Sequence, residues 1–379
     1  MRVRVDTPLA VLLADRIRQS GPITFAEYME ACLYHPRYGY YSRPDQQPRR
    51  DYVTSVDVSP LFGRLLLRQF HEMWQWMGSP ARFALVEAGA GTGALAKSIL
   101  EAASENFDDF YSTLNYVAVE RSETRRSAHS ELLCPHLERG HFESTANLPA
   151  HVGLGCIFSN ELLDALPVHR VVKQAGELRE MYVGFGEERG FHNVSAAPST
   201  ARIAWYFREQ GIALVEDQQA EVSLNAWDWI RDAGQRLEKG FVLTIDYGHF
   251  AAELYDERHM RGTLLAYEKH RASEDYFRAP GDQDLTAHVN FTVLELAGRL
   301  AGLAPVGYTP QTNFLLSLAR HSHFADIESP SAMRKEASRA RLLFKTLIHP
   351  EGMGETFQVF AQQKGVDAPR VRLTGFGPL

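Results

Sequence analysis

A glycine-rich turn directly after an apolar run is the feature that most constrains how this chain can fold. Residues 83–96 read FALVEAGAGTGALA. An apolar stretch ending at Glu87 and a helix-forming stretch flank the turn, whose glycines are Gly89, Gly91 and Gly93, so the pattern predicts a strand, a turn and a helix. Glycine lets a ligand approach the bare backbone. Because such turns follow strands at the ligand-binding edge of a parallel sheet, we expect a nucleoside cofactor here.

Two acidic residues bear on which cofactor the turn binds. Gly89, Gly91 and Ala94 fit the dinucleotide pattern, which is a weak signal alone. Glu87 lies inside the predicted turn, where a carboxylate suits an ammonium group better than a pyrophosphate. Glu120 ends the next apolar run 29 residues after Gly91, whereas the dinucleotide pattern expects an acid about 20 residues on. An NAD-type site and a purely structural turn stay open as alternatives.

The arrangement of these acids and glycines resembles the cofactor site of class I S-adenosylmethionine methyltransferases. In that resemblance Glu120 holds the ribose hydroxyls, and Glu87 lies near the amino-acid part of the cofactor. The resemblance therefore implies S-adenosyl-L-methionine as the cofactor.

Composition excludes several other classes of protein. The chain has 379 residues, of which 45% are hydrophobic, enough for a large core. Its net charge of −7 argues against a nucleic-acid partner. The three cysteines, Cys32, Cys134 and Cys156, follow no metal-binding or redox spacing, so we expect no metal site. No apolar run approaches the roughly 20 residues of a membrane helix, and no secretory core is present, so the expected location is cytoplasmic, without membrane insertion.

The first 80 residues are expected to form a helical N-terminal extension. The spacing of apolar residues over 9–33 predicts two helices, and Thr24 with Glu27 forms a capping-box pattern at the start of the second. Four tyrosines between Tyr34 and Tyr41 either belong to the core or wall a ligand pocket. A longer amphipathic helix is predicted over 61–77.

Polar residues follow the predicted fourth strand, LGCIF at 154–158. Residues just past the carboxyl ends of parallel strands meet the ligand, so we expect Asn160, Glu161 and Asp164 to face the transferred group. The alternative for Glu161 and Asp164 is that they only cap a short helix over 162–167.

An acid also follows the predicted fifth strand, 241–245, where Asp246 would reach the same edge of the sheet. The helix before this strand is expected to end at Gly240. A weakly marked third strand is placed near 137–142.

Residues 81–379 form the expected catalytic domain, with two added segments. Alternating residues over about 168–222 predict inserted β-hairpins. The polar stretch of about 249–290 is expected to be a lid-like segment. Within it, His288 is either a base near neutral pH or a structural hydrogen-bonding group. A last strand is predicted at 357–362.

Motifs along nearly the whole chain resemble those of the MidA family of class I methyltransferases. They are GPITFAEYMEACLYHPRYGYYS at 21, DYVTSVDVSPLFG at 51, VEAGAGTG at 86, SNELLDALPVHR at 159, TIDYG at 244, GTLLAY at 262, DLTAHVNF at 284 and GMGETFQVFAQ at 352. The resemblance implies an α/β fold with a Rossmann-like, mostly parallel sheet and an antiparallel last strand. It also implies methylation of protein arginine, with a respiratory complex I subunit as substrate and the mitochondrial matrix as the location in a eukaryote. The chain departs from the family pattern at Asp57 and Asn290.

The chemistry of methyl transfer fits the acids at the strand ends. The sulfonium of the cofactor carries the leaving group, so the protein has to position a nucleophile and exclude water, without a metal. A guanidinium nucleophile is always protonated in solution, and carboxylates bind it by paired hydrogen bonds. Glu161, Asp164 and Asp246 supply such carboxylates. The competing hypotheses are an NAD-type oxidoreductase and a non-enzymatic assembly factor that keeps the fold.

Overall fold

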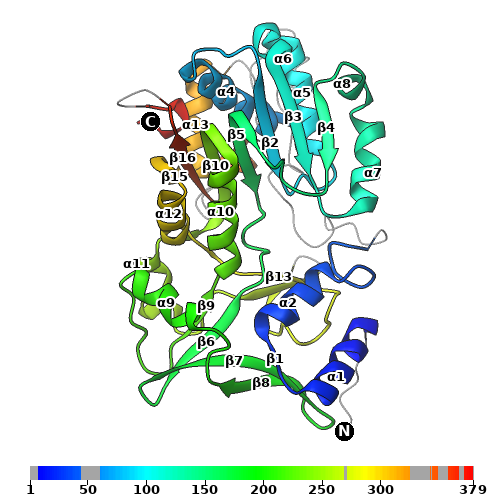
Figure 1. The fold of residues 1–379 in the computed structure, drawn as a ribbon, viewed down its shortest axis with the longest axis vertical. Coiled ribbons are helices and arrows are strands. Elements are labelled where there is room, and N and C mark those ends of the chain that lie inside the picture. Colours follow the sequence, from blue (N-terminus) through cyan, green and yellow to red (C-terminus); the bar gives the residue numbers. More distant parts are fainter. Residues whose placement is uncertain are drawn as a thin grey trace. The chain divides into compact units, whose positions relative to one another are not determined.

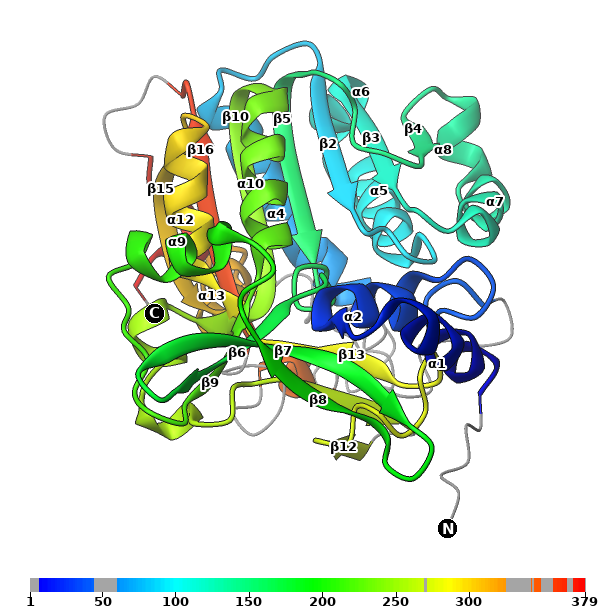
Figure 2. The same cartoon turned by 60° about the horizontal axis from the view of Figure 1, so that its bottom comes forward.

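The computed structural model describes residues 7–43, 60–268, 271–324, 342, 344–348, 357–366 and 371–378. Asp57 and most of the last predicted helix, over 333–347, lie outside these ranges. The chain folds into two compact units, drawn in Figures 1 and 2. The large-sheet unit comprises residues 53–162, 230–247 and 295–379, and the hairpin unit comprises residues 1–52, 163–229 and 248–294.

One sheet dominates the large-sheet unit. In spatial order its strands are β15 (Ala304–Pro310), β16 (Phe357–Lys364), β10 (Leu237–His249), β5 (Val152–Asn160), β2 (Phe83–Ala88), β3 (Leu114–Val119) and β4 (Phe142–Thr145). The strands from β10 to β4 run parallel, whereas β16 is antiparallel to both of its neighbours. The predicted mostly parallel sheet with an antiparallel last strand is therefore confirmed.

Helices on both sides of this sheet cover its apolar strands. They are α4 (Pro60–Trp76), α5 (Ala94–Asn106), α6 (Asp108–Thr113), α7 (Glu123–Leu132), α8 (Cys134–Glu138), α10 (Leu224–Arg236), α12 (Phe291–Leu300) and α13 (Gln311–His321). Figure 2 shows α10 in front of the sheet and α4 behind it. The ring of Phe70 on α4 packs 4.8 Å from that of Phe158 on β5. The 3₁₀ turn η4 (Thr374–Phe376) is tied to α4, because Glu72 accepts the Thr374 N–H.

The order of the strands reverses beside β2. The chain goes from β2 to β3 and β4 on one side and then returns to β5 on the other side. In open parallel sheets, ligands bind at the carboxyl ends of the strands where the order reverses. The glycine turn follows β2 and Asn160 ends β5, so both predicted site segments lie at this point.

Three predicted boundaries in this unit are wrong. The third parallel strand is β4, not 137–142, and Leu137 belongs to α8, which starts at Cys134 with a proline in its first turn. Gly240 does not end α10 but lies inside β10, where a Cβ would stand only 1.8 Å from the Gly155 carbonyl oxygen of the neighbouring strand. Strand β10 extends to His249, so Asp246 lies within the strand rather than after it.

The hairpin unit contains two smaller sheets. The first has strands β1 (Ile23–Thr24), β6 (His169–Gln174), β7 (Glu177–Gly186), β8 (Gly190–Ala196) and β9 (Gln219–Val222). Antiparallel pairing of β6 with β7 and of β7 with β8 confirms the inserted hairpins. The second sheet has strands β11 (Leu265–Glu268), β12 (Arg271–Ser273) and β13 (Asp284–Thr286), and β14 (Val289–Asn290) pairs with the end of β10.

Helices α1 (Pro8–Ser20), α2 (Phe25–Tyr34), α9 (Ala201–Glu209) and α11 (Ala251–Leu254) and the 3₁₀ turn η2 (Glu257–His259) complete the hairpin unit. The predicted capping box is confirmed, since Thr24 Oγ1 accepts the Glu27 N–H at 3.1 Å and Glu27 accepts the Thr24 N–H at 3.0 Å. Tyr28 and Tyr40 are buried in the core of the unit. Among the described residues, no helix has the length and apolar character needed to cross a membrane.

Candidate functional site

The turn after β2 depends on its glycines. Gly89, Gly91 and Gly93 have φ values of 78°, 55° and 79°, a region that side-chain-bearing residues rarely adopt. The N–H groups of Gly89 and Ala90 both donate to the Val119 carbonyl at the end of β3, which fixes the start of the turn. A Cβ on Gly91 would meet nothing closer than the Gly89 oxygen at 3.9 Å among the described residues. Within the described part of the chain, the space beside the Gly91 backbone is therefore open to a ligand.

Glu120, directly after β3, holds the same turn. Its Oε2 accepts the Gly91 N–H at 2.9 Å, and its Oε1 accepts the Ser122 N–H at 2.8 Å. The guanidinium of Arg125 lies 4.0 Å from Oε2. Each carboxylate oxygen can accept more than one hydrogen bond, so Glu120 keeps the capacity to bind ligand hydroxyls.

Glu87 lies beneath the turn rather than inside it. It is the penultimate residue of β2 and is only 4% exposed, which corrects its predicted position. The Tyr116 hydroxyl donates to Glu87 Oε2 at 2.7 Å. The pKa of Glu87 is raised to about 8, mainly by burial and in small part by the charge of Glu120, against the opposing effect of the Tyr116 hydrogen bond. A cationic ligand at the turn would favour the ionised form of Glu87 beside the Glu120 carboxylate.

A strained residue follows β5. Glu161 has a φ of 53°, which is uncommon for a residue with a Cβ. Such a conformation is unfavourable in free energy, and residues that adopt it are often found at functional sites. The Asn160 amide donates to Glu161 Oε1 at 3.0 Å. Asn160 Oδ1 is buried and accepts no hydrogen bond from the residues that the structure describes. A ligand N–H or O–H would satisfy this oxygen.

Asp246 fixes the backbone around Glu161 by hydrogen bonds. It is fully buried, and its Oδ2 accepts the Leu162 N–H at 3.2 Å while Oδ1 accepts the Tyr247 N–H at 3.0 Å. The Glu161 N–H donates to the Ile245 carbonyl at 3.0 Å. Bonds from the end of β10 thus fix the backbone on both sides of the Glu161 carbonyl. No helix occupies 162–167, so neither Glu161 nor Asp164 caps one, and that alternative is wrong.

Asp164 belongs to the hairpin unit, where it lies near another acid. Its carbonyl accepts the Ala287 N–H at 3.0 Å, and the residue is 5% exposed. The Tyr41 hydroxyl donates to Asp284 at 2.8 Å. Burial raises the pKa of Tyr41 well above 10, and the charges of Asp284 and Asp164 add to this effect. Asp164, Asp284 and Tyr41 are therefore close to one another within this unit.

His288, also in the hairpin unit, is not a solitary histidine. Its ring lies 5.5 Å from that of His249, which in turn lies 5.9 Å from the ring of His259. The pKa of His288 is lowered to about 4, mainly by burial and in part by the charges of His249 and His259. A group with this pKa is a weak base at neutral pH, which favours the structural alternative over the basic one.

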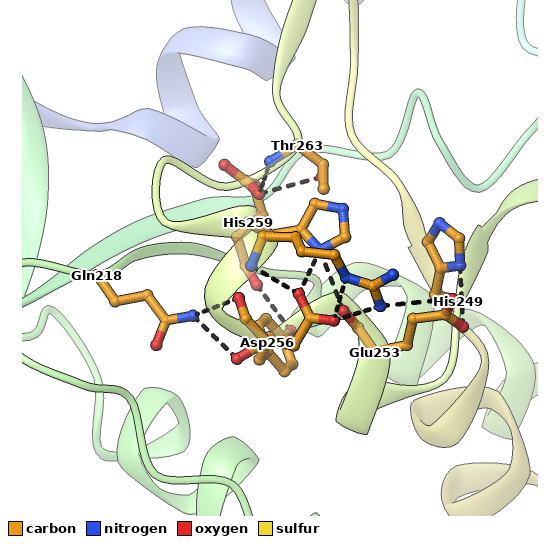
Figure 3. Close-up of polar contacts among 9 residues, drawn as sticks. Gln218, His249, Glu253, Asp256, His259 and Thr263 are labelled. Carbon is orange, nitrogen blue, oxygen red and sulfur yellow. Dashed lines mark hydrogen bonds and ion pairs between the residues drawn. The ribbon is translucent and has the colours of Figure 1, made fainter.

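The segment around these histidines is tied together by acids and amides, as Figure 3 shows. His249 pairs with Glu253 at 3.2 Å, and His259 lies 3.4 Å from Asp256. Gln218 donates to the carbonyls of Tyr255 and Asp256 at 2.9 and 3.4 Å. Among the described residues, no group of three or more histidine, cysteine, aspartate or glutamate side chains has an arrangement suited to a metal ion.

Asn290, a departure from the family pattern, has a structural role in the hairpin unit. It is 3% exposed, and its amide nitrogen donates to Gln210 Oε1 at 2.7 Å and lies 3.2 Å from the hydroxyl oxygens of both Tyr206 and Tyr255. A carboxylate has no donor for the Gln210 oxygen. The asparagine therefore fits this network better than the acid of the family pattern.

His129 is a site residue that sequence reasoning missed. Its ring contacts the Gly91 carbonyl oxygen at 2.9 Å, although it lies 38 residues further along the chain. No motif marks it, since it appears in the sequence as one polar residue on the helix α7.

Comparison with known proteins agrees with this geometry. Residues 65–309 match the model of a family of S-adenosyl-L-methionine-dependent methyltransferases. The chain belongs to this family. A Burkholderia thailandensis protein of the COG1565 superfamily, solved with S-adenosyl-homocysteine bound, is 32% identical, with a TM-score of 0.86 over 97% of this chain and 94% of that chain.

Curated relatives extend over most of the chain. The cattle protein named "Protein arginine methyltransferase NDUFAF7, mitochondrial" is 30% identical over 94% of this chain and 83% of its own length. The Drosophila melanogaster homologue with a corresponding name is 28% identical over 94% of this chain and 85% of its own length. The MidA resemblance and the S-adenosyl-L-methionine cofactor are thus confirmed, and neither the oxidoreductase nor the scaffold alternative is supported.

Proposed function

We propose that this methyltransferase transfers a methyl group from S-adenosyl-L-methionine to an arginine side chain of a protein substrate. The names of the curated relatives support arginine as the acceptor. The observation that carries the proposal in this chain is the strained conformation of Glu161 at the edge of the sheet. The Asn160 amide orients its carboxylate, and a hydrogen bond to β10 fixes its backbone.

The cofactor would lie along the glycine turn. Gly89, Gly91 and Gly93 would present bare backbone to it, and Glu120 would accept hydrogen bonds from its ribose hydroxyls. Glu87 would face its ammonium group, since an anion beneath the turn is stabilised by a cation. Asn160 Oδ1 would accept a hydrogen bond from a cofactor N–H. The open space at Gly91 and the buried Asn160 oxygen support this placement.

Glu161 would bind the acceptor guanidinium and receive its proton. The cofactor supplies an activated methyl group, and the guanidinium nitrogen that gains the methyl has to lose a proton. A carboxylate paired to the guanidinium localises its charge and provides the route for that proton. Asp246 would act through the backbone by holding Leu162. Asp164, three residues after Glu161, stays a proposed second carboxylate for the substrate, and His288 is not needed as the base.

The protein substrate that the family resemblance implies is a subunit of respiratory complex I. We propose that subunit as the first acceptor to test, because the relatives named above are mitochondrial proteins. The assay would incubate the purified chain and labelled cofactor with complex I subunits from cells that lack this methyltransferase. Amino-acid analysis of the labelled product would then separate methylarginine from methyllysine.

The Glu161→Gln variant tests the catalytic assignment. Glutamine can still accept the Asn160 amide but cannot take a proton, so we expect methylation to fall about 100-fold or more, with cofactor affinity within about threefold of wild type. Glu101→Gln, on the exposed side of α5, is the matched control and should behave as wild type. Unchanged methylation by Glu161→Gln would remove Glu161 from the mechanism.

A further inference from the structure

The backbone of Gly91 is held from two sides. Its N–H donates to Glu120 Oε2 at 2.9 Å, and its carbonyl oxygen lies 2.9 Å from His129 Nε2. These bonds fix the two peptide planes that flank Gly91. Glycine has the widest backbone freedom of all residues, so a turn of alternating glycines keeps one conformation only if its peptides are restrained.

Hydrogen bonding sets the tautomer of His129. A carbonyl oxygen can only accept, so Nε2 carries the hydrogen that it donates to Gly91. On the other side of the ring, Nδ1 lies 2.9 Å from Ser144 Oγ on β4, and it accepts the serine hydroxyl hydrogen. Burial lowers the pKa of His129, so the ring is neutral at pH 7 and this tautomer is stable.

The position of His129 leaves the ligand side of the turn open. The ring is fully buried, and a Cβ on Gly93 would stand 3.0 Å from its Cδ2 atom, so the histidine packs directly against the turn. At Gly91, in contrast, the space beside the Cα is open. The histidine therefore supports the turn from within the protein, and no described side chain, His129 included, fills the space beside the Gly91 Cα.

We propose that His129 is a positioning residue for the cofactor: by donating to the Gly91 carbonyl it holds the glycine turn in the binding conformation. It acts through the Gly91 backbone and does not touch the reacting atoms. This inference rests on the proposed placement of the cofactor along the turn. Since the turn would bind the cofactor equally in the ground state and in the transition state, loss of His129 should affect KM for the cofactor rather than kcat.

Three variants of the full chain test this role. His129→Leu removes the donor, whereas His129→Gln restores an N–H donor at a similar distance from the backbone. His136→Leu is the matched control, because His136 is also a buried histidine of this unit but bonds the Tyr111 hydroxyl instead of the turn. We would measure S-adenosyl-L-methionine affinity by isothermal titration, KM and kcat with the labelled-methyl assay, and the melting temperature.

We expect His129→Leu to weaken cofactor binding about tenfold or more and to raise KM by the same factor, with kcat at saturating cofactor within about twofold of wild type. His129→Gln should recover affinity to within about threefold. The melting temperatures of His129→Leu and His136→Leu should fall by similar amounts, while His136→Leu keeps wild-type affinity. Weaker cofactor binding in His129→Leu alone, with similar melting temperatures in both variants, would show that His129 positions the turn and does not only stabilise the fold.

Unchanged affinity in His129→Leu, or an equal loss in His136→Leu, would overturn the inference. If His129→Leu does not fold, Ser144→Ala takes its place, since it removes the hydroxyl that holds Nδ1. Ser144→Ala should weaken binding about threefold, and wild-type affinity there would also overturn the inference. Failure of the wild-type chain, or unchanged affinity of Gly91→Val, would instead overturn the placement of the cofactor.

Discussion

At the scale of single residues, Glu87 is the group whose ionisation should report on the cofactor. Burial raises its pKa from 4.5 to about 8, so at pH 7 it is mostly protonated in the free protein. The unfolded chain would bind fewer protons than the folded one between pH 4.5 and 8. The stability contributed by the neutral Glu87 is therefore complete below pH 4.5 and is lost as the pH rises through about 8.

A cationic ligand beside Glu87 should reverse this protonation. An ammonium group favours the carboxylate form, so binding of S-adenosyl-L-methionine at pH 7 should release about one proton. Isothermal titration in buffers of different ionisation enthalpy measures the number released. In Glu87→Gln the release should vanish. Proton release that persists in Glu87→Gln would assign it to another group and place Glu87 away from the ammonium.

Site residues that lie close to an apolar run in the sequence could be predicted from the sequence. The glycine turn, Asn160 and Glu161 each come soon after an apolar run, so their place near the end of a strand follows from the pattern. The contacts of His129 and Glu87 could not be predicted in this way. The contact of His129 with Gly91 depends on how α7 packs, and the hydroxyl that bonds the buried Glu87 comes from Tyr116 on a neighbouring strand.

At the scale of elements, the stretch from β10 to β11 is bound by buried side chains of β9 and of the residue before it. Gln218, only 1% exposed, donates to the carbonyls of Tyr255 and Asp256 (Figure 3). Glu221 accepts the N–H of Thr263 at 2.8 Å. These bonds hold residues 255–263 in place within the hairpin unit. That the wider segment 249–290 acts as a lid stays a prediction.

The Gln218→Met variant tests how much these bonds stabilise the element. Methionine has a similar length but no polar group, so the Tyr255 carbonyl oxygen and the Val215 N–H would each lose a hydrogen-bond partner. The free energy of unfolding should therefore fall by about 1–3 kcal/mol. Chemical denaturation monitored by fluorescence would measure it. Gln174→Met, at an exposed position of β6, is the control and should change stability by less than about 0.5 kcal/mol. Equal stability of the two variants would show that the bonds contribute little.

Strong local signals predicted some elements well, and weak ones failed. The capping box fixed the start of α2, and apolar spacing located α4 to within one residue at each end. Strand β4 has four residues and begins soon after the short α8, so its pattern carries little information. The length of β10 was missed because its last two residues pair with β14, a contact between distant parts of the chain.

At the scale of the whole molecule, the two units are not separate segments of sequence. The chain passes between them several times, and three of the boundaries fall inside α10, β10 and α12. The proposed cofactor residues all belong to the large-sheet unit, whereas Asp164 and His288 belong to the hairpin unit. Since neither unit is a continuous stretch of chain, binding and activity have to be measured on the full chain.

The central claim is that the glycine turn after β2 binds S-adenosyl-L-methionine, and one titration tests it most directly. The wild-type chain and Gly91→Val would each be titrated with this cofactor, with NAD as the control ligand. Gly140→Val is the matched control variant, because Gly140 also has a positive φ, of 76°, and open space around it, but lies away from the turn.

We predict saturable binding of S-adenosyl-L-methionine, but not of NAD, to the wild-type chain and to Gly140→Val. Gly91→Val should bind about tenfold more weakly or not at all, because its side chain would fill the open space and strain the turn. Wild-type affinity in Gly91→Val, or absence of binding by the wild-type chain, would contradict the account.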